Sequence, residues 1–379
     1  MRLTLLTILS LVFILSSYGQ DQKKDNFVGP VHFKKVKVSS ETYESVGVFD
    51  VNGDGKPDLV SGAFWYEGPD YVQRHFISEV KRVDEYWDEF MHIPMDVNGD
   101  GKMDYITGGW FAGTLYWMEN PGDNGHWKKH SIDSTGNIET ARGFDLDGDG
   151  NLEIIPNNPG HPLKYYKLIT DSNGKGTGKF SKVDVAPTGD KRIDIIVNNG
   201  WLEAPKDLKG KWTLHQEFDF GDASIPVLVL EIKKNGINDL IVGQGHSYGL
   251  RWYEQKIDSD GKRDWIEHPI DLNNSQYHTM EWVDIDGDGE EELITGKRYR
   301  AHNGKDPGAN DPIGLYYFKW NGESFTKNII SYGPLDQGKG AGIYFAVTDL
   351  RNSGRKDVIV AGKDGLYIFY NEGQGQVAN

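Results

Sequence analysis

A short acidic loop recurs along the chain, and it limits the possible folds more than any other feature. Four segments carry it in full: VGVFDVNGDGKPDLVSG from Val46, IPMDVNGDGKMDYITGG from Ile93, RGFDLDGDGNLEIIPNN from Arg142 and EWVDIDGDGEEELITGK from Glu281. The lead acidic residues of these copies and of three weaker ones are Asp50, Asp96, Asp145, Asp184, Glu231, Asp284 and Asp349. They are 39 to 65 residues apart, which suits one four-stranded unit per repeat.

Each repeat has the pattern of a strand, a tight acidic turn and a second strand, with β-branched and aromatic residues on both sides of the turn. An aromatic third strand and a more polar fourth strand follow, as in 114–118 and 127–132. We therefore predict an all-β, seven-bladed β-propeller. The N-terminal strand 31–38 is expected to complete the last blade and so remove a free sheet edge. An open two-sheet sandwich is the alternative, and six or eight blades stay possible if the weak repeat from Val183 is not a blade.

The N-terminus predicts export. Arg2, the apolar run Leu5–Leu15 and the small residues Ser17 and Gly19 form the pattern of a signal peptide over residues 1–19. A retained membrane anchor is the competing interpretation, but the run is short for a bilayer span, and we expect no membrane insertion. Residues 20–379 would then form one propeller domain, secreted or periplasmic. The chain has no cysteine, so this exported domain is expected to fold without disulfides.

The formal net charge of -16 argues against nucleic acid and anionic membranes as partners. Bound cations would neutralise part of this charge, and the acidic loops place oxygen ligands at positions 1, 3, 5 and 9. Calcium is the hard cation that such oxygens bind, so we expect about four structural calcium ions; an acidic turn without an ion is the alternative. The predicted ligands are Asp50, Asn52, Asp54 and Asp58; Asp96, Asn98, Asp100 and Asp104; Asp145, Asp147, Asp149 and Glu153; and Asp284, Asp286, Asp288 and Glu292.

The loops resemble the FG-GAP or VCBS repeats of integrin-type propellers. The shared pattern is D-x-[DN]-x-D-G-x-x-[DE] between hydrophobic strands, and it covers nearly all of the chain after the signal peptide. An EF-hand would need a glutamate at position 12 and flanking helices, both of which are missing. The resemblance implies a propeller and calcium, but such propellers serve adhesion, carbohydrate binding and catalysis alike.

Strand geometry predicts where a functional site would lie. If the acidic turns occupy one face, the residues before each first strand and after each second strand converge at the opposite mouth. They are Glu41, Glu44, Glu89, His92, Glu139, Arg142, Tyr277, His278 and Tyr344, together with Phe64, Trp65, Trp110, 157–161, 198–201, 244–246 and 297–302. Aromatic rings with acids, bases and cations are the groups that a sugar site uses.

Four histidines share this face: His161, His246, His278 and His302. A single histidine is more often structural than catalytic, and six others (His32, His75, His126, His130, His215 and His268) fall on outer strands or loops and look like surface residues. The densest polar cluster pairs His278 with the segment Lys297-Arg298-Tyr299-Arg300-Ala301-His302.

The stretch from His278 to Pro312 also resembles the propeller domain of aldos-2-ulose dehydratase, as do 110–121 and 157–163. That resemblance implies a carbon–oxygen lyase that dehydrates a keto- or anhydro-sugar, without the activity of the cupin domains that follow the propeller there. A non-catalytic propeller that binds carbohydrate or protein is the alternative. The sugar, any linkage and the oligomeric state stay open.

Such a dehydration needs a base for the α-proton, a cation for the enolate and an acid for the leaving hydroxyl. His278 or His246 is the candidate base, and Tyr299 or His302 the candidate acid. Lys297 and Arg298, or alternatively a zinc ion on the histidines, would stabilise the negative charge. The sequence does not show whether the two basic side chains or a zinc ion would stabilise this charge.

Overall fold

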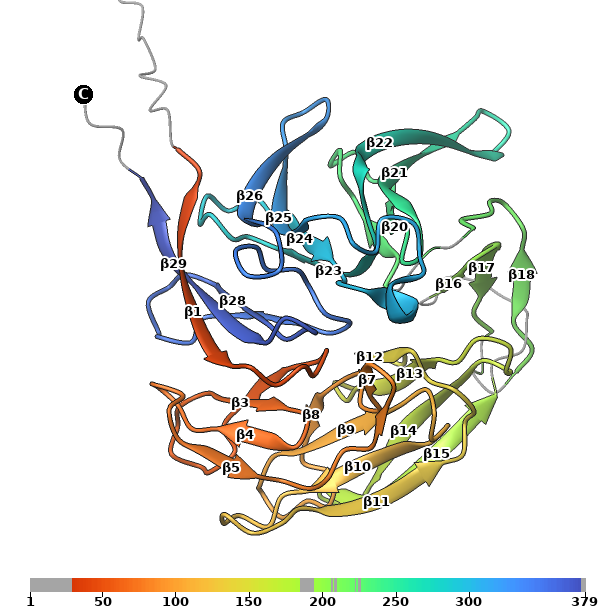
Figure 1. Ribbon diagram of the computed structural model, residues 1–379. Coiled ribbons are helices and arrows are strands. Elements are labelled where there is room, and N and C mark those ends of the chain that lie inside the picture. The colour runs from red at the N-terminus through yellow and green to blue at the C-terminus, as the bar shows by residue number, and fades with distance from the viewer. Residues whose placement is uncertain are drawn as a thin grey trace, which may run out of the picture.

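The structure is a computed structural model that describes residues 29–184, 194–205, 207, 210–221, 223 and 226–375. The predicted signal peptide, residues 1–19, lies outside these ranges. The described residues form seven antiparallel sheets and one small hairpin, with no α-helix among them. The sheets follow one another around a ring (Figure 1). The predicted all-β, seven-bladed propeller is therefore confirmed.

We number the blades in chain order, and their strands are as follows. Blade 1 holds β2 (Gly47–Phe49), β3 (Asp58–Ser61), β4 (Phe64–Tyr66) and β5 (Arg74–Phe76); blade 2 holds β8 (Ile93–Met95), β9 (Asp104–Gly108), β10 (Leu115–Glu119) and β11 (Lys128–Asp133). Blade 3 holds β12 (Thr140–Phe144), β13 (Glu153–Asn157), β14 (Lys164–Thr170) and β15 (Gly176–Asp184); blade 4 holds β16 (Ile195–Val197), β17 (Gly200–Glu203) and β18 (Thr213–His215). Blade 5 holds β19 (Leu228–Leu230), β20 (Asp239–Gly243), β21 (Tyr248–Ile257) and β22 (Arg263–Ser275); blade 6 holds β23 (Tyr277–Val283), β24 (Glu292–Lys297), β25 (Ile313–Trp320) and β26 (Phe325–Gly333). Blade 7 holds β27 (Ala346–Thr348), β28 (Asp357–Val360), β29 (Leu366–Gln374) and, as its outer strand, β1 (Val31–Ser39).

Both ends of the chain contribute to blade 7. β1 runs antiparallel to β29 from the Val31–Gln374 pair to the Ser39–Leu366 pair. The neighbouring blades 7 and 1 also meet near the ring centre, where the Val46 N–H donates to the Tyr344 carbonyl at 3.1 Å. The first and last blades are thus held together by hydrogen bonds as well as by packing.

The weak repeat predicted to begin at Val183 is placed differently by the structure. Val183 pairs with Tyr165 near the end of β15, the outer strand of blade 3, and so is not on the first strand of blade 4. Alternation of apolar residues does not distinguish an outer strand from the inner strand that follows it, which explains the error. Residues 185–193 lie outside the described ranges, and the described part of blade 4 is a three-stranded sheet.

Hydrophobic clusters lie between neighbouring blades. Ile106 and Trp117 of blade 2 pack with Ile154 and Tyr166 of blade 3, and all four are nearly inaccessible to solvent. Equivalent clusters join blades 4 and 5, 5 and 6, 6 and 7, 7 and 1, and 1 and 2. Because the sheets bury both faces against their neighbours, apolar residues follow one another along the strands. Each blade therefore depends on its neighbours for stability.

Four of the histidines expected at the surface instead pack on tryptophans. Each lies on the fourth strand, or on the third strand of blade 4, stacks on a tryptophan of the preceding strand at 4.1 to 4.3 Å between ring centroids, and contacts a glutamate through Nε2. The sets are His75–Trp65–Glu67, His130–Trp117–Glu119, His215–Trp201–Glu203 and His268–Trp252–Glu254. Stacking and a charged hydrogen bond explain why these histidines are only partly exposed.

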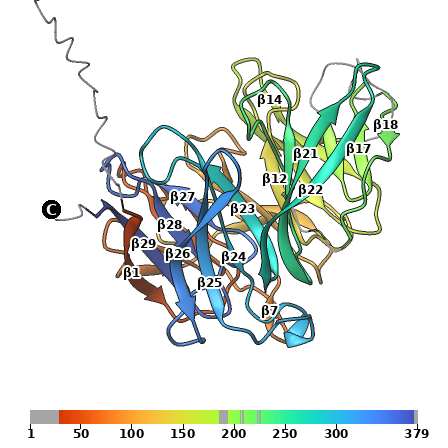
Figure 2. The same ribbon diagram turned by 90° about the horizontal axis from the view of Figure 1, so that it is seen from above.

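Two insertions stand at one end of the ring. The hairpin β6 (Arg82–Val83) and β7 (Tyr86–Trp87) follows blade 1, and the short 3₁₀ helix η1 (Ala301–Gly304) follows β24. They lie close together (Figure 2), and the Asn303 N–H donates to the Tyr86 hydroxyl at 3.1 Å. None of the described helices has the length and apolar character that crossing a membrane requires.

Candidate functional site: a histidine cluster at the channel mouth

The acidic loops and the histidine cluster occupy opposite ends of the blades. In blade 6 the acidic loop connects the Val283–Glu292 pair, whereas Tyr277 and Lys297 pair at the other end of the same two strands. Antiparallel pairing therefore places His278 at the mouth away from the loop. The same relation holds in blade 3, where Glu139 precedes β12 and the acidic loop follows it.

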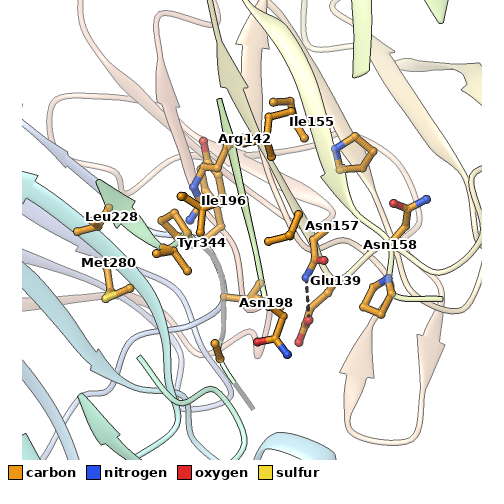
Figure 3. A pocket seen from close by; sticks show the side chains of 18 of the residues that line it. Glu139, Arg142, Ile155, Asn157, Asn158, Ile196, Asn198, Leu228, Met280 and Tyr344 are labelled. Atoms are coloured by element: carbon orange, nitrogen blue, oxygen red, sulfur yellow. Dashed lines mark hydrogen bonds between the residues drawn. The ribbon is translucent and has the colours of Figure 1, made fainter. Parts of the chain in front are cut away.

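A cavity of about 1770 Å³ lies inside the ring. Its walls come from both ends of the channel, and they include Glu139, His246 and His302 at the mouth and Arg142 and Tyr344 farther along. Figure 3 shows part of this wall, where side chains of several blades face a common space. A volume of this size accommodates a ligand larger than a monosaccharide.

Three side chains from three blades converge at the mouth. The Glu139 Oε1 atom lies 3.4 Å from His246 Nε2 and 3.4 Å from His278 Nε2. The other oxygen of Glu139 accepts a hydrogen bond from Asn157 Nδ2 at 3.2 Å, which orients the carboxylate (Figure 3). We call Glu139, His246 and His278 the mouth triad; its ligand atoms lie within 4.8 Å of one another.

Asp306 holds two of the imidazole rings. Its carboxylate contacts His246 Nδ1 at 3.1 Å and His302 Nδ1 at 2.8 Å. The two rings stack with centroids 4.2 Å apart and an angle of 8°. An imidazole that donates through Nδ1 to a carboxylate presents an unprotonated Nε2, so Asp306 prepares His246 to accept a proton or to bind a metal.

A buried arginine borders the triad. Arg298 donates from Nε and Nη2 to the two oxygens of Glu44, at 2.9 and 3.3 Å, and its Nη1 lies 3.2 Å from His278 Nε2. Burial and the positive charge of Arg298 hold the pKa of His278 well below its usual value. His278 is therefore neutral near pH 7, and its Nε2 is an acceptor or a metal ligand.

Glu139 and His246 shift each other's pKa values. Burial opposes ionisation of Glu139, but the contact with His246 and the positive charges around it outweigh that cost and lower the pKa to about 2. Burial likewise opposes protonation of His246, yet Glu139 and Asp306 raise its pKa. A proton and a bound cation would therefore compete for His246 Nε2 beside these carboxylates.

The other predicted catalytic residues lie apart from the triad. His161 is exposed and contacts Asn137 Oδ1 at 3.0 Å on the cavity wall. Lys297 is buried, and its ammonium donates to Ser275 Oγ at 2.7 Å, to Gln276 Oε1 and to the Gly308 carbonyl. Lys297 therefore secures the loop after η1, whereas Tyr299 is half-buried between Arg298 and Arg300 in sequence.

In the acidic loops, the backbone wraps around the lead aspartate. Asp50 accepts from the N–H groups of Gly53 at 2.7 Å and Gly55 at 2.8 Å, and both glycines have positive φ angles, of 77° and 82°. The leads Asp96, Asp145 and Asp284 make the same pair of bonds. This conformation explains the glycines of the motif.

Position nine differs between two pairs of loops. In blade 1, both oxygens of Asp58 accept from backbone N–H groups, those of Val51 at 2.8 Å and Gly68 at 2.7 Å. Asp104 of blade 2 makes the equivalent bonds. Burial raises the pKa of Asp104 to about 7, a cost to the ionised form that a nearby cation would offset.

In blades 3 and 6 a lysine ammonium lies among the loop carboxylates. Lys167 Nζ is 2.5 Å from Asp147, 2.6 Å from Asp149 and 3.0 Å from Glu153. Lys319 takes the same place beside Asp286, Asp288 and Glu292. In the strand pairing, Glu67 of blade 1 and Glu119 of blade 2 occupy the positions that Lys167 and Lys319 occupy in blades 3 and 6. A built-in cation is thus present in two of the four loops.

Sequence reasoning placed Glu44 and Glu139 on the rim but did not include Asp306. Asp306 follows a segment with left-handed backbone at Arg300, His302 and Asn303, so neither helical nor strand periodicity predicts which way it faces. A carboxylate four residues after His302 was the only signal in the sequence.

One family model and two solved structures show a likeness to this chain. The FG-GAP-like repeat family matches residues 96–155. Among solved structures, an Agrocybe aegerita lectin that recognises non-reducing terminal N-acetylglucosamine is similar to this chain, with 14% identity, coverage of 88% of this chain and 79% of that one, and a TM-score of 0.39. The Photorhabdus luminescens Tc holotoxin pore is also similar, with 13% identity, coverage of 90% and 15%, and a TM-score of 0.34.

Both structural likenesses are too distant to bear on function, and no curated protein matches the chain. The fold rests instead on the seven sheets and on the repeat itself. The chain is a seven-bladed β-propeller with an FG-GAP-like repeat.

Proposed function

We propose that the protein is a metal-assisted carbon–oxygen lyase that removes water from a sugar at the channel mouth. The convergence of Glu139 Oε1, His246 Nε2 and His278 Nε2 carries this proposal. The sequence resemblance to aldos-2-ulose dehydratase supports the reaction class. The cavity supports the substrate class, because amides such as Asn157 and Asn198 and the ring of Trp201 line it together, as expected for a polyhydroxylated ligand.

The spacing within the triad suits a zinc ion, which would take the lone pair of His278 Nε2 that now faces Arg298 Nη1 at 3.2 Å. Ligands about 2.0–2.1 Å from a tetrahedral zinc are about 3.3–3.4 Å from one another, and both contacts of Glu139 measure 3.4 Å. This spacing is long for a hydrogen bond. Asp306 supplies the outer carboxylate that histidine ligands of zinc ordinarily contact. Glu139 and Asp306 both contact His246, so a dication bound by the triad would lie beside two carboxylates.

A bound zinc ion would polarise the substrate carbonyl and stabilise negative charge on its oxygen. Residues of the chain would transfer the protons. His302, whose side chain is 56% exposed and held by Asp306, is the group placed to take the α-proton. Departure of the β-hydroxyl as water then forms the carbon–carbon double bond, with the proton supplied by the protonated His302 or by solvent. Arg298 keeps Glu44 paired and His278 neutral.

The test uses keto- and anhydro-sugars as substrates, with formation of the conjugated enone followed by absorbance. We expect turnover by the wild-type chain, loss of about 100-fold or more in kcat for His302→Ala, and unchanged zinc content in that variant. His161→Ala is the matched control and should retain activity. Full activity of His302→Ala would contradict the assignment of the base. Saturable sugar binding without turnover by any substrate would favour the non-catalytic carbohydrate-binding alternative.

We also propose that calcium stabilises the acidic loops of blades 1 and 2. These loops combine buried position-nine aspartates with Glu67 or Glu119 nearby, and their own lysines, Lys56 and Lys102, each pair with a single loop aspartate, Asp54 or Asp100. In blades 3 and 6 the carboxylate oxygens of Asp145, Asp147 and Glu153, and of Asp284, Asp286 and Glu292, also lie within 4.8 Å of one another. A calcium ion there would have to take the place of Lys167 or Lys319, so we expect the loops of blades 1 and 2 to bind calcium more readily. Export, inferred from residues 1–19, would place the protein where calcium is abundant.

A further inference from the structure

Arg142 is a half-buried cation on the cavity wall. It lies on β12, and its guanidinium stands 4.4 Å from the centroid of the Tyr344 ring (Figure 3). Arg298 and Arg300, the arginines of the mouth, form salt bridges with Glu44 and Glu85. Among the described residues Arg142 has no such carboxylate partner in salt-bridge contact, although it is largely removed from water.

The hydrogen bonds of Arg142 use three of its five N–H groups. Nη1 donates to Thr140 Oγ1 at 3.1 Å and to the Ala141 carbonyl at 3.0 Å, and Nη2 donates to Thr279 Oγ1 at 3.0 Å. Arginine has five N–H groups, so the Nε–H and one Nη2–H remain. Those two N–H groups form the edge with which Arg298 binds both oxygens of Glu44, and it matches a carboxylate in two parallel bonds.

Arg142 lies farther along the cavity wall than the mouth triad, but its hydrogen-bond partners come from residues beside the triad in the sequence. Thr140 and Ala141, which accept from Nη1, directly follow Glu139, and Thr279, which accepts from Nη2, directly follows His278. The same three contacts fix the position of the guanidinium with respect to blades 3 and 6. A ligand that fills the cavity can therefore contact Arg142 as well as Glu139 and His246, which line the same cavity.

Within the channel, the positive charge of Arg142 acts on the carboxyl group of Glu281. Glu281 also lines the cavity, and burial raises its pKa, with Arg142 acting in the opposite direction. Glu281 acts on Arg142 by charge and not through a salt bridge among the described residues, so it offsets the positive potential of Arg142 less than a direct partner would.

We propose that the cavity selects an acidic sugar, namely a uronic acid unit, and that Nε–H and Nη2–H of Arg142 bind its carboxylate. The choice of a sugar as ligand rests on the proposed function, whereas the choice of an anionic one rests on Arg142. A flanking aromatic ring, Tyr344, and neighbouring amides suit the ring and hydroxyl groups of the same ligand.

Calorimetric titration with two matched pairs of sugars tests this proposal: D-glucuronate against D-glucose, and D-galacturonate against D-galactose. Each pair differs only in a carboxylate or a hydroxymethyl group. We expect the wild-type protein to bind the acid about tenfold or more tightly in at least one pair, as a charge-assisted bidentate contact predicts. Equal binding within both pairs, or binding of none of the four sugars, would overturn the proposal.

The variant Arg142→Gln keeps an amide that can donate to Thr279 but removes the pair of N–H groups, Nε–H and Nη2–H, that would bind a carboxylate. It should bind acid and neutral sugar equally, with an unchanged melting temperature and metal content. Retention of the preference by this variant would also overturn the proposal. Lys164→Gln, a charge change at a half-buried residue that is absent from the cavity wall, is the matched control.

A carboxylate that bound zinc would mimic the preference, and His246→Ala separates the two explanations. This variant is expected to lose zinc yet keep the Arg142-dependent preference for the acid. A preference that disappears with the zinc would contradict the role of Arg142. If the wild-type protein selects acidic sugars but shows neither zinc nor turnover, the proposed lyase fails while the anion site stands; turnover without selection gives the opposite result.

Discussion

At the scale of single residues, the two ring nitrogens of His246 contact different carboxylates. Nδ1 contacts Asp306 at 3.1 Å, and Nε2 faces Glu139 Oε1 at 3.4 Å. The sequence could place His246, His278 and Glu139 at one mouth, because hairpins send these chain positions to the same end of every blade. It could not place Asp306, whose direction depends on the left-handed φ angles of Arg300, His302 and Asn303 and not on a repeating pattern.

Lys297 gives a prediction at this scale. It was expected to act on substrate, but its ammonium is enclosed by Ser275, Gln276 and Gly308, and burial lowers its pKa to about 8. The unfolded lysine has a pKa near 10.4, so the unfolded state binds the proton more tightly between these values. Stability should therefore increase as the pH rises from about 8 to about 10, by at most about 3 kcal/mol from this group.

The measurement is the free energy of unfolding of the wild type minus that of Lys297→Met, followed from pH 7 to pH 10. We expect the difference to shift in favour of the wild type as the pH rises. A flat difference, or one that declines, would show that Lys297 is not enclosed as the structure has it.

At the scale of elements, asparagine side chains join one blade to the next. Asn120, after β10, is 1% exposed and donates from Nδ2 to the Val51 carbonyl in the acidic loop of blade 1 at 2.8 Å. Asn371 of blade 7 makes the matching bond to Ile285 in blade 6 at 2.7 Å. Sequence periodicity predicts the strands that carry these residues. The links themselves depend on the approach of separate blades, so they could not be predicted.

Replacing Asn120 by alanine should lower the free energy of unfolding by about 2–4 kcal/mol, because it leaves buried carbonyl groups of Val51 and Met103 without a donor. Chemical denaturation measures the change. Asn273→Ala is the control, since Asn273 is exposed, and it should change stability by less than about 0.5 kcal/mol. Equal stability of the two variants would contradict the inter-blade link.

The acidic loop of blade 6 gives a second prediction at this scale. Lys319 balances Asp286, Asp288 and Glu292, and burial raises the pKa of Glu292 to about 7. Removing the ammonium in Lys319→Met should let calcium take its place, since clustered carboxylates repel one another without a cation. Equilibrium dialysis followed by metal analysis should give about one more calcium per chain than in the wild type.

Lys56→Met provides the comparison for that experiment. Lys56 pairs only with the exposed Asp54 at the rim of the blade 1 loop, so its removal should not add a calcium site. A calcium content that is the same in wild type and Lys319→Met would show that the lysine does not stand in for the ion.

At the scale of the whole molecule, the seven blades bring residues that are far apart in the sequence to one mouth. Glu139, His246 and His278 come from blades 3, 5 and 6, and the repeat alone predicted that the blades close into a ring. The exact pairing of the triad depends on how neighbouring blades twist and pack, which no single repeat encodes. Only the assembled ring creates the site.

Chelation tests the contribution of metal ions to this assembly. An ion that binds only the folded loops stabilises by mass action, about 2.7 kcal/mol per site at one hundred times its Kd. Excess chelator should therefore lower the melting temperature by several degrees, and added calcium should restore it. A melting curve that chelator leaves in place would contradict a stabilising role for calcium.

The most direct test of the central claim is the zinc content of the purified wild-type protein beside Glu139→Gln and His246→Ala, after equilibration with zinc and dialysis. We predict about one zinc per chain in the wild type, and loss of it in both variants at unchanged calcium content. Wild-type protein that retains no zinc, or variants that retain as much as the wild type, would contradict a metal centre formed by Glu139, His246 and His278.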